Sequence, residues 1–206
     1  MIWLNYSLKM LSPLQCQSWL TDTEWQYAQT LSEKRARQFC NGRALVRKML
    51  RHIQAADTND IAISLPSDKA PTLIVGEKHW YLSLSHSKEA IAAAISINEK
   101  IGLDIEQIKP RQFKQLQQGH TALQHAPDLN TFYQQWTLAE AYSKYSSNAL
   151  LEVLRSGLPG QIRHKYFTLP GYMLCLVHHN SDTEITLSEN GAILPVSIRN
   201  NINAPG

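Results

Sequence analysis

Residues 90–106 of the chain, AIAAAISINEKIGLDIE, contain two short apolar runs that decide the fold class. Residues 90–97 and 101–105 each have the length and composition of a buried β-strand. Residues 98–100 between them predict a hairpin turn, so we expect these two strands to pair. Just before them, residues 81–85 alternate apolar and polar side chains, as a half-buried strand does.

Two longer stretches have the periodicity of helices. Residues 31–53 begin at the candidate N-cap Ser32 and repeat apolar side chains at helical spacing, with Arg43 in the middle of the apolar stripe. A charge at such a position must be paired or face a cavity. Residues 131–149 predict a second helix, and residues 166–178 predict a strand. The order of helix and strands, repeated twice, predicts an α+β fold.

Composition excludes several classes of protein. The 206 residues are 43% apolar and 18% charged, values of a globular chain rather than a collagen, a coiled coil or a disordered protein. A net charge of +3 is too small to indicate a nucleic-acid partner, and no apolar run or leader pattern indicates a membrane or a signal peptide. Three cysteines without a C-x-x-C motif argue against structural zinc or a disulfide framework, so we expect reduced thiols in a cytoplasmic protein.

The stretch Gly102-Leu103-Asp104-Ile105-Glu106 places two carboxylates where they can share one ligand. Successive side chains of a strand point to opposite faces, so Asp104 and Glu106 lie together, opposite Leu103 and Ile105. Two residues along a strand span roughly 7 Å, which lets both carboxylates reach a single Mg²⁺. An ordinary solvent-exposed strand face has the same pattern, so the pair by itself leaves both interpretations open.

A third carboxylate lies on the second predicted helix. Trp136, Glu140 and Lys144 are four residues apart and therefore share one helix face. Glu140 either forms an ordinary surface ion pair with Lys144 or points into a cleft, where it helps to hold the metal or accepts a proton. Ser85 and His86, at the end of a predicted strand, are suited to hydrogen-bond a phosphate, although an isolated histidine is more often structural.

Four segments, taken in order, resemble the motifs of the larger, two-lobed (Sfp-type) 4′-phosphopantetheinyl transferases. Residues 39–47, FCNGRALVR, are similar to the family's F-x-x-x-R-x-x-x-R helix, and Lys69-Ala70-Pro71 to its lysine–proline loop. Leu84-Ser85-His86-Ser87 is similar to its serine–histidine motif. The most specific match is Gly102-Leu103-Asp104-Ile105-Glu106 followed by Trp136-x-x-x-Glu140-Ala141-x-x-Lys144. Each segment is weak alone, and the specificity lies in their joint occurrence, order and spacing.

The resemblance implies a fold of two similar α+β lobes, with the active site between them. Residues 1–100 would form the lobe that carries the coenzyme A-binding helix and loop, and residues 101–206 the lobe that carries the metal-binding strand and helix. The implied reaction transfers 4′-phosphopantetheine from coenzyme A to a serine of an acyl or peptidyl carrier protein and releases adenosine 3′,5′-bisphosphate. The resemblance also implies a monomer, because both lobes lie in one chain.

Residue roles follow from the same match. Asp104, Glu106 and Glu140 would bind Mg²⁺, which neutralises the pyrophosphate and the charge on the leaving oxygen. Glu140 also matches the residue proposed as the general base toward the carrier serine. Lys144 matches the lysine near the pyrophosphate, where it would stabilise the group in transfer.

Arg43, Lys69, Ser85 and His86 match positions that bind phosphates of coenzyme A, which would explain a charge on the apolar stripe of the first helix. One departure is Ala139, where many members carry a lysine directly before the metal-binding glutamate. It favours the first alternative, a non-catalytic relative that only holds coenzyme A or a carrier protein. The second alternative is another two-carboxylate metal enzyme, such as a phosphodiesterase.

The first predicted helix carries many basic side chains, among them Arg35, Arg37 and Lys48. Carrier proteins are usually acidic, so these side chains are suited to steer such a partner. A solvated helix face would look the same in the sequence, and both interpretations stay open.

Overall fold

The computed structural model describes residues 1–67, 70–190 and 192–193, and it has an α+β fold with two sheets. The chain forms two compact units. The first contains Met1–Asn98 together with the late strands β9 (Ile185–Glu189) and β10 (Ala192–Ile193), and the second lies within Glu99–Asp182. The range 101–206 given above for the second lobe therefore includes a segment whose strands pair within the first unit.

The first unit is built on a seven-stranded sheet in the order β10-β9-β1-β5-β4-β3-β2. Neighbouring strands are antiparallel except β1 and β9, which are parallel. The remaining strands of this sheet are β1 (Ile2–Ser7), β2 (Ile61–Ile63), β3 (Leu73–Val75), β4 (Lys78–Ser87) and β5 (Ala90–Ser96). All seven residues of β5 are buried, which explains why the strand consists almost entirely of alanine and isoleucine.

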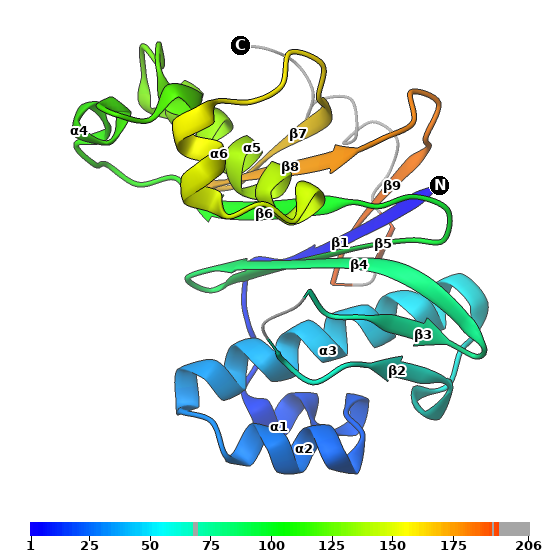
Figure 1. Ribbon diagram of the computed structural model, residues 1–206. Helices are drawn as coiled ribbons and strands as arrows, with labels where there is room; N and C mark the ends of the chain where they lie inside the picture. The colour runs from blue at the N-terminus through cyan, green and yellow to red at the C-terminus, as the bar shows by residue number, and fades with distance from the viewer. Residues whose placement is uncertain (68–69, 191, 194–206) are drawn as a thin grey trace. The chain divides into compact units, whose positions relative to one another are not determined.

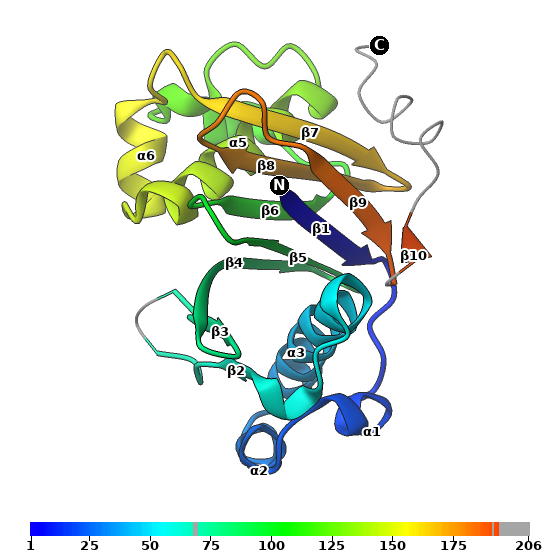
Figure 2. The same ribbon diagram turned by 90° about the vertical axis from the view of Figure 1, so that its right-hand side faces the viewer.

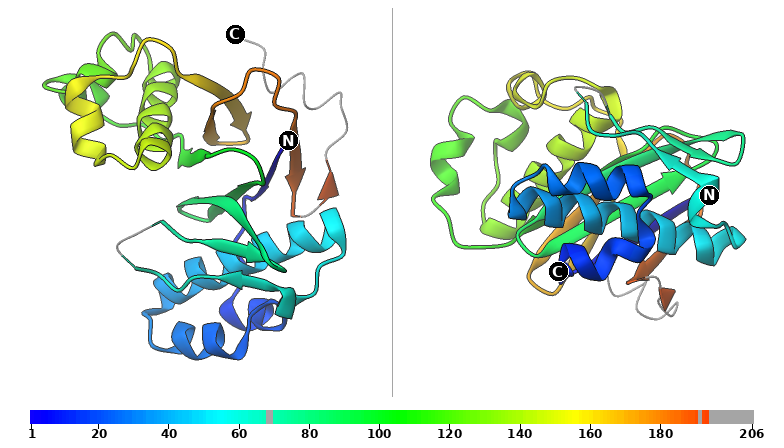
Figure 3. Two further views of the ribbon diagram at one scale, coloured as in Figure 1. Left: turned by 45° about the vertical axis from the view of Figure 1, so that its right-hand side comes forward. Right: turned by 90° about the horizontal axis from the view of Figure 1, so that it is seen from below.

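Three helices complete the described part of the first unit. They are α1 (Pro13–Cys16), α2 (Asp22–Gln29) and α3 (Glu33–Gln54), with short 3₁₀ turns at Gln17–Trp19 and Thr58–Asp60. The long helix α3 lies against the sheet (Figures 1 and 2), and α2 runs beside α3 in the right-hand view of Figure 3. Ser32 is the N-cap of α3, as predicted, although its side chain makes no capping hydrogen bond.

The second unit contains a three-stranded antiparallel sheet in the order β6-β8-β7. Its strands are β6 (Gly102–Gln107), β7 (Arg163–Leu169) and β8 (Tyr172–His178), and its helices are α4 (Phe113–Gln117), α5 (Leu129–Ser146) and α6 (Leu150–Ser156), with a 3₁₀ turn at Thr121–Leu123. Helix α5 packs on β6 and β8, and Figure 3 shows it beside α6. The carboxylate of Asp128 accepts a hydrogen bond from Thr131 N at 2.8 Å and caps α5, which begins two residues earlier than predicted.

Two predictions of strand pairing are wrong. Strands β5 and β6 form no hairpin, because β1 and β4 occupy both edges of β5, and β6 pairs instead with β8 in the other sheet. Residues 166–178 are not one strand but the hairpin of β7 and β8, which turns at Gly171, where φ is +75°.

Cys16, Cys40 and Cys175 are free cysteines, and all three are buried. None of the helices within the described ranges combines the length and the apolar character needed to cross a bilayer.

Candidate functional site

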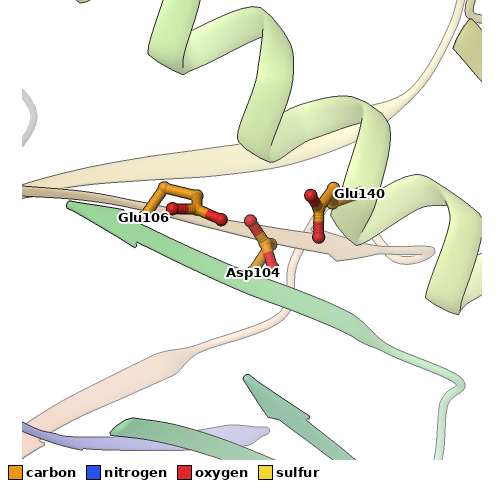
Figure 4. Close-up of side chains that lie close together, drawn as sticks. All are labelled: Asp104, Glu106 and Glu140. Carbon is orange, nitrogen blue, oxygen red and sulfur yellow. The ribbon is translucent and has the colours of Figure 1, made fainter. Parts of the chain in front are cut away.

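Three carboxylates converge in the second unit, two from β6 and one from α5 (Figure 4). One oxygen each of Asp104, Glu106 and Glu140 lies within 4.8 Å of the other two. Asp104 is only 1% exposed, and the two glutamates are partly buried. The structure thus brings together the three carboxylates that the sequence analysis singled out, although Glu140 lies at least 34 residues after the two strand carboxylates.

Gly102 allows β6 to approach α5 closely. A Cβ atom on this residue would overlap the carbonyl oxygen of Ala141 and lie 2.8 Å from the backbone nitrogen of Tyr145, so only glycine fits. Asp104 and Glu106 follow at intervals of two and therefore lie on one face of the strand. Figure 4 shows their head groups directed toward that of Glu140.

Lys144 contacts the carboxylate cluster from the same helix as Glu140. Its Nζ donates to Asp104 Oδ1 and to the carbonyl oxygen of Leu103, each at 2.9 Å. Within the described part of the chain it forms no ion pair with Glu140, so the surface-pair interpretation of these two residues is wrong. Glu140 instead faces the two carboxylates of β6.

Glu140 lies close to the negative charges of Asp104 and Glu106. Burial and the charge of Asp104 together raise the pKa of Glu140 to about 8, and the opposing effect of Lys144 is insufficient to restore the ordinary value of 4.5. A cation bound among these oxygens would relieve both the repulsion and the loss of hydration. All three donors are carboxylate oxygens, which suit a hard divalent ion, and the cluster can hold a metal ion.

Ala139, the departure from the family pattern, lies outside this cluster of charges. Its side chain is fully buried in the apolar core of the second unit, together with Phe132 and Tyr133. A lysine here would have to bury its stem in that core, and its ammonium would need a partner or a route to water. The alanine therefore contributes to packing in this chain, and it removes no ligand from the carboxylates.

A cavity of about 510 Å³ lies in the first unit, large enough for a small-molecule ligand. Three of the residues matched to coenzyme A binding, Arg43, Ser85 and His86, line it together. The fourth, Lys69, lies outside the described residues. Aromatic and apolar side chains, including those of Tyr27 and Phe39, form much of the remaining wall.

Arg43 is both paired and directed toward this cavity, so the two explanations for a charge on the apolar stripe hold at once. Its Nε lies 3.4 Å from Glu24 Oε1, its Nη2 donates to the carbonyl oxygen of Ser64 at 2.6 Å, and its Cζ lies 4.6 Å from the centre of the Phe39 ring. The sequence analysis missed Glu24. The spacing of Thr21 and Glu24 is a capping-box signal, which the structure bears out, but it carries no information about a partner on another helix.

The basic side chains of α3 have three different environments. Arg35 lines the cavity. Arg37 forms an ion pair with Glu89 at 2.7 Å and donates to the carbonyl oxygen of Met10. These contacts connect α3 to the turn between β4 and β5 and to the segment after β1. Lys48 lies over the ring of Trp19. Arg35, Arg37 and Lys48 all keep some exposure to solvent, and the steering of an acidic partner by them stays a prediction.

In comparisons with known proteins, no family model matches the chain, and no curated protein matches it either.

Proposed function

We propose that the chain is a 4′-phosphopantetheinyl transferase, which moves the phosphopantetheine arm of coenzyme A to a serine of an acyl or peptidyl carrier protein. The observation that carries this proposal is the convergence of Asp104, Glu106 and Glu140. The strand and helix motifs that supply them are separated in sequence and resemble one family in their order and spacing. The proposal includes two similar lobes. In each unit a long helix packs on antiparallel strands, which supports this part of the proposal.

Mg²⁺ is the ion that we propose for Asp104, Glu106 and Glu140. Three carboxylate oxygens leave coordination positions for phosphate oxygens and water, as Mg²⁺ sites in phosphoryl-transfer enzymes usually do. When bound, the ion supplies charge neutralisation at the pyrophosphate and at the leaving oxygen. Lys144, held at Asp104, adds a fixed positive charge beside the carboxylates.

The proposed reaction exchanges one phosphorus–oxygen bond for another. The serine oxygen of the carrier protein bonds to the phosphorus that carries pantetheine, and the bond from this phosphorus to the bridging oxygen breaks. The bridging oxygen leaves as part of adenosine 3′,5′-bisphosphate. Glu140 accepts the serine proton, a role supported by its match to the residue proposed as general base in the family and by its place in the carboxylate cluster.

The cavity of the first unit supports the coenzyme part of the proposal. Phosphate groups pair with guanidinium and imidazole donors, which Arg43 and His86 supply, and the hydroxyl of Ser85 lies in the same wall. The aromatic rings of Tyr27 and Phe39 offer apolar surface for a nucleobase.

Transfer is tested by intact-mass measurement of several apo carrier proteins incubated with the chain, coenzyme A and Mg²⁺. We expect at least one carrier to gain the mass of one phosphopantetheine group. Asp104→Ala and Glu140→Ala should each lower the rate by about a hundredfold or more, since each removes a group from the reacting centre. Glu152→Gln, a change at an exposed glutamate of α6, is the matched control and should leave the rate unchanged.

Two outcomes would replace the proposal with one of its alternatives. Binding of coenzyme A without mass gain on any carrier, in Mg²⁺ or Mn²⁺, would indicate the non-catalytic relative that Ala139 favours. Metal-dependent hydrolysis of a simple phosphodiester in the absence of a carrier, without transfer, would indicate a phosphodiesterase.

A further inference from the structure

Two buried arginines on α3 share one buried carboxylate in the first unit. Glu24 is 3% exposed, Arg43 3% and Arg47 1%. Among the residues that the structure describes, a single negative charge thus faces two guanidiniums, and this group of three carries a net charge of +1 away from water. A buried charge that its neighbours do not neutralise is costly unless another ion compensates it.

The carboxylate is divided unequally between the two arginines. Arg47 approaches both of its oxygens, with Nη1 2.9 Å from Oε2 and Nη2 donating to Oε1 at 3.1 Å. Arg43 reaches only Oε1, at 3.4 Å from its Nε. The remaining capacity of Oε2 goes to the backbone N–H of Thr21, which donates at 3.0 Å. Glu24 is therefore committed to Arg47, and the uncompensated positive charge lies mainly on Arg43.

Arg43 is the member of this group that reaches the cavity. Its Nη2 is taken by the carbonyl oxygen of Ser64 and its planar face by the ring of Phe39. Its Nη1 has no hydrogen bond with any described residue, and Arg43 lines the cavity whereas Arg47 does not. Burial lowers the pKa of Arg43 to about 10, as expected for a guanidinium that lacks full compensation.

We propose that Arg47 is a positioning residue for anion binding in this cavity: by occupying Glu24, it leaves the charge of Arg43 available to a phosphate group. The inference rests on the proposed function in taking a phosphate of coenzyme A as the natural ligand. We call this unequal sharing of Glu24, which leaves the charge of Arg43 available, the charge division. It does not depend on transfer activity. Arg47 lies outside the cavity lining, and the proposal is that its charge raises the affinity for a phosphate through Glu24 and Arg43.

Removing Arg47 alone should weaken anion binding. In Arg47→Met, Glu24 loses its closest partner and pairs with Arg43, whose charge is then neutralised. We expect the affinity for adenosine 3′,5′-bisphosphate, measured by calorimetry without a divalent metal, to fall about tenfold. Arg51→Met is the matched control, because it removes an exposed arginine of the same helix, outside the cavity lining, and should leave the affinity unchanged.

Removing both partners should restore binding. The double variant Glu24→Gln/Arg47→Met has the net charge of the original chain and again leaves Arg43 without a competing carboxylate. Affinity close to that of the unaltered protein is the expected result. If Arg47 only supported the fold, the double variant would bind no better than Arg47→Met. The double variant also tests the idea if Arg47→Met fails to fold, since a folded double variant with tenfold weaker binding would overturn it.

The choice of probes separates this inference from the proposed function. Adenosine 3′,5′-bisphosphate, ATP and inorganic pyrophosphate are each titrated into the unaltered chain, and none of these measurements requires transfer. Binding of any of them, weakened in Arg47→Met and restored in the double variant, supports the charge division even if no carrier protein is ever modified. A folded chain that binds none of the three would refute the charge division.

Discussion

Each unit places a glutamate among buried charges, but the balance of charge is opposite. Glu24 in the first unit faces two guanidiniums. Glu140 in the second unit faces two carboxylates, and the ammonium of Lys144 only partly offsets their effect on its pKa. Two guanidiniums thus compensate the carboxylate of Glu24, whereas burial and the charges of Asp104 and Glu106 raise the pKa of Glu140 to about 8. The comparison teaches that a glutamate held between two cations is a structural group, whereas a glutamate that converges with two other carboxylates can hold a metal ion.

The largest effect on stability is expected from Glu24→Gln. The change leaves two buried guanidiniums without a counter-charge, and breaking a buried ion pair in this way destabilises a protein by about 3–5 kcal/mol. Urea unfolding measures the loss, and Glu77→Gln, at an exposed position of the same unit, is the control. A loss below about 1 kcal/mol would show that Glu24 does not balance the two arginines.

The second prediction concerns the carboxylate cluster of the second unit. It separates the strand carboxylates from Glu140. In Gly102→Ala the new methyl group meets backbone atoms of α5, which cannot move aside as a flexible side chain would. We expect a loss of about 2–3 kcal/mol in the free energy of unfolding and weaker Mg²⁺ binding. Gly160→Ala is the control, because no atom lies within 4 Å of its added Cβ. Equal stability of the two variants would contradict the close approach of β6 to α5.

Local patterns predict much of this fold. The helix predicted over 31–53 corresponds to α3, and the strand predicted over 90–97 to β5, because apolar periodicity reports the side of an element that faces a core. The two-residue spacing of Asp104 and Glu106 correctly predicts that they share a face, since alternation is a property of any strand. These inferences need no knowledge of a distant partner.

Pairing between distant segments is where the sequence analysis fails. The hairpin of β5 and β6 looked favourable because a short turn joins them, yet β1 and β4 take both edges of β5. Glu24 was missed for the same reason, since its capping-box spacing reports only on the start of its own helix and not on Arg47, 23 residues later. Family resemblance supplied the link between Glu140 and the strand carboxylates, which periodicity alone leaves open.

The third prediction concerns pH and the charge of Glu140. In the absence of metal its pKa is raised to about 8, whereas the unfolded chain has the ordinary value of 4.5. The group therefore stabilises the fold fully below pH 4.5, and this contribution is lost as the pH rises toward 8. Bound Mg²⁺ must displace the proton, so its affinity should rise about tenfold per pH unit below 8 and level off above it. Calorimetric titration between pH 6 and 9 measures this slope, and a flat profile would exclude a protonated Glu140.

The smallest effect gives the clearest test of the comparison, because its sign is opposite to that of Glu24→Gln. In Glu140→Gln, measured at pH 8 with a chelator, the change removes a carboxylate that is about half ionised at this pH and is repelled by Asp104, and the free energy of unfolding should rise by about 1 kcal/mol. We also expect Mg²⁺ to stabilise the unaltered protein but not Glu140→Gln, because a ligand that binds only the folded state stabilises it more strongly the tighter it binds. Glu152→Gln, which changes the same type of residue at an exposed position, should alter neither quantity. If Glu140→Gln destabilises the metal-free protein as Glu24→Gln does, then Glu140 is compensated by groups of the protein itself, and the carboxylate cluster has no need of a cation.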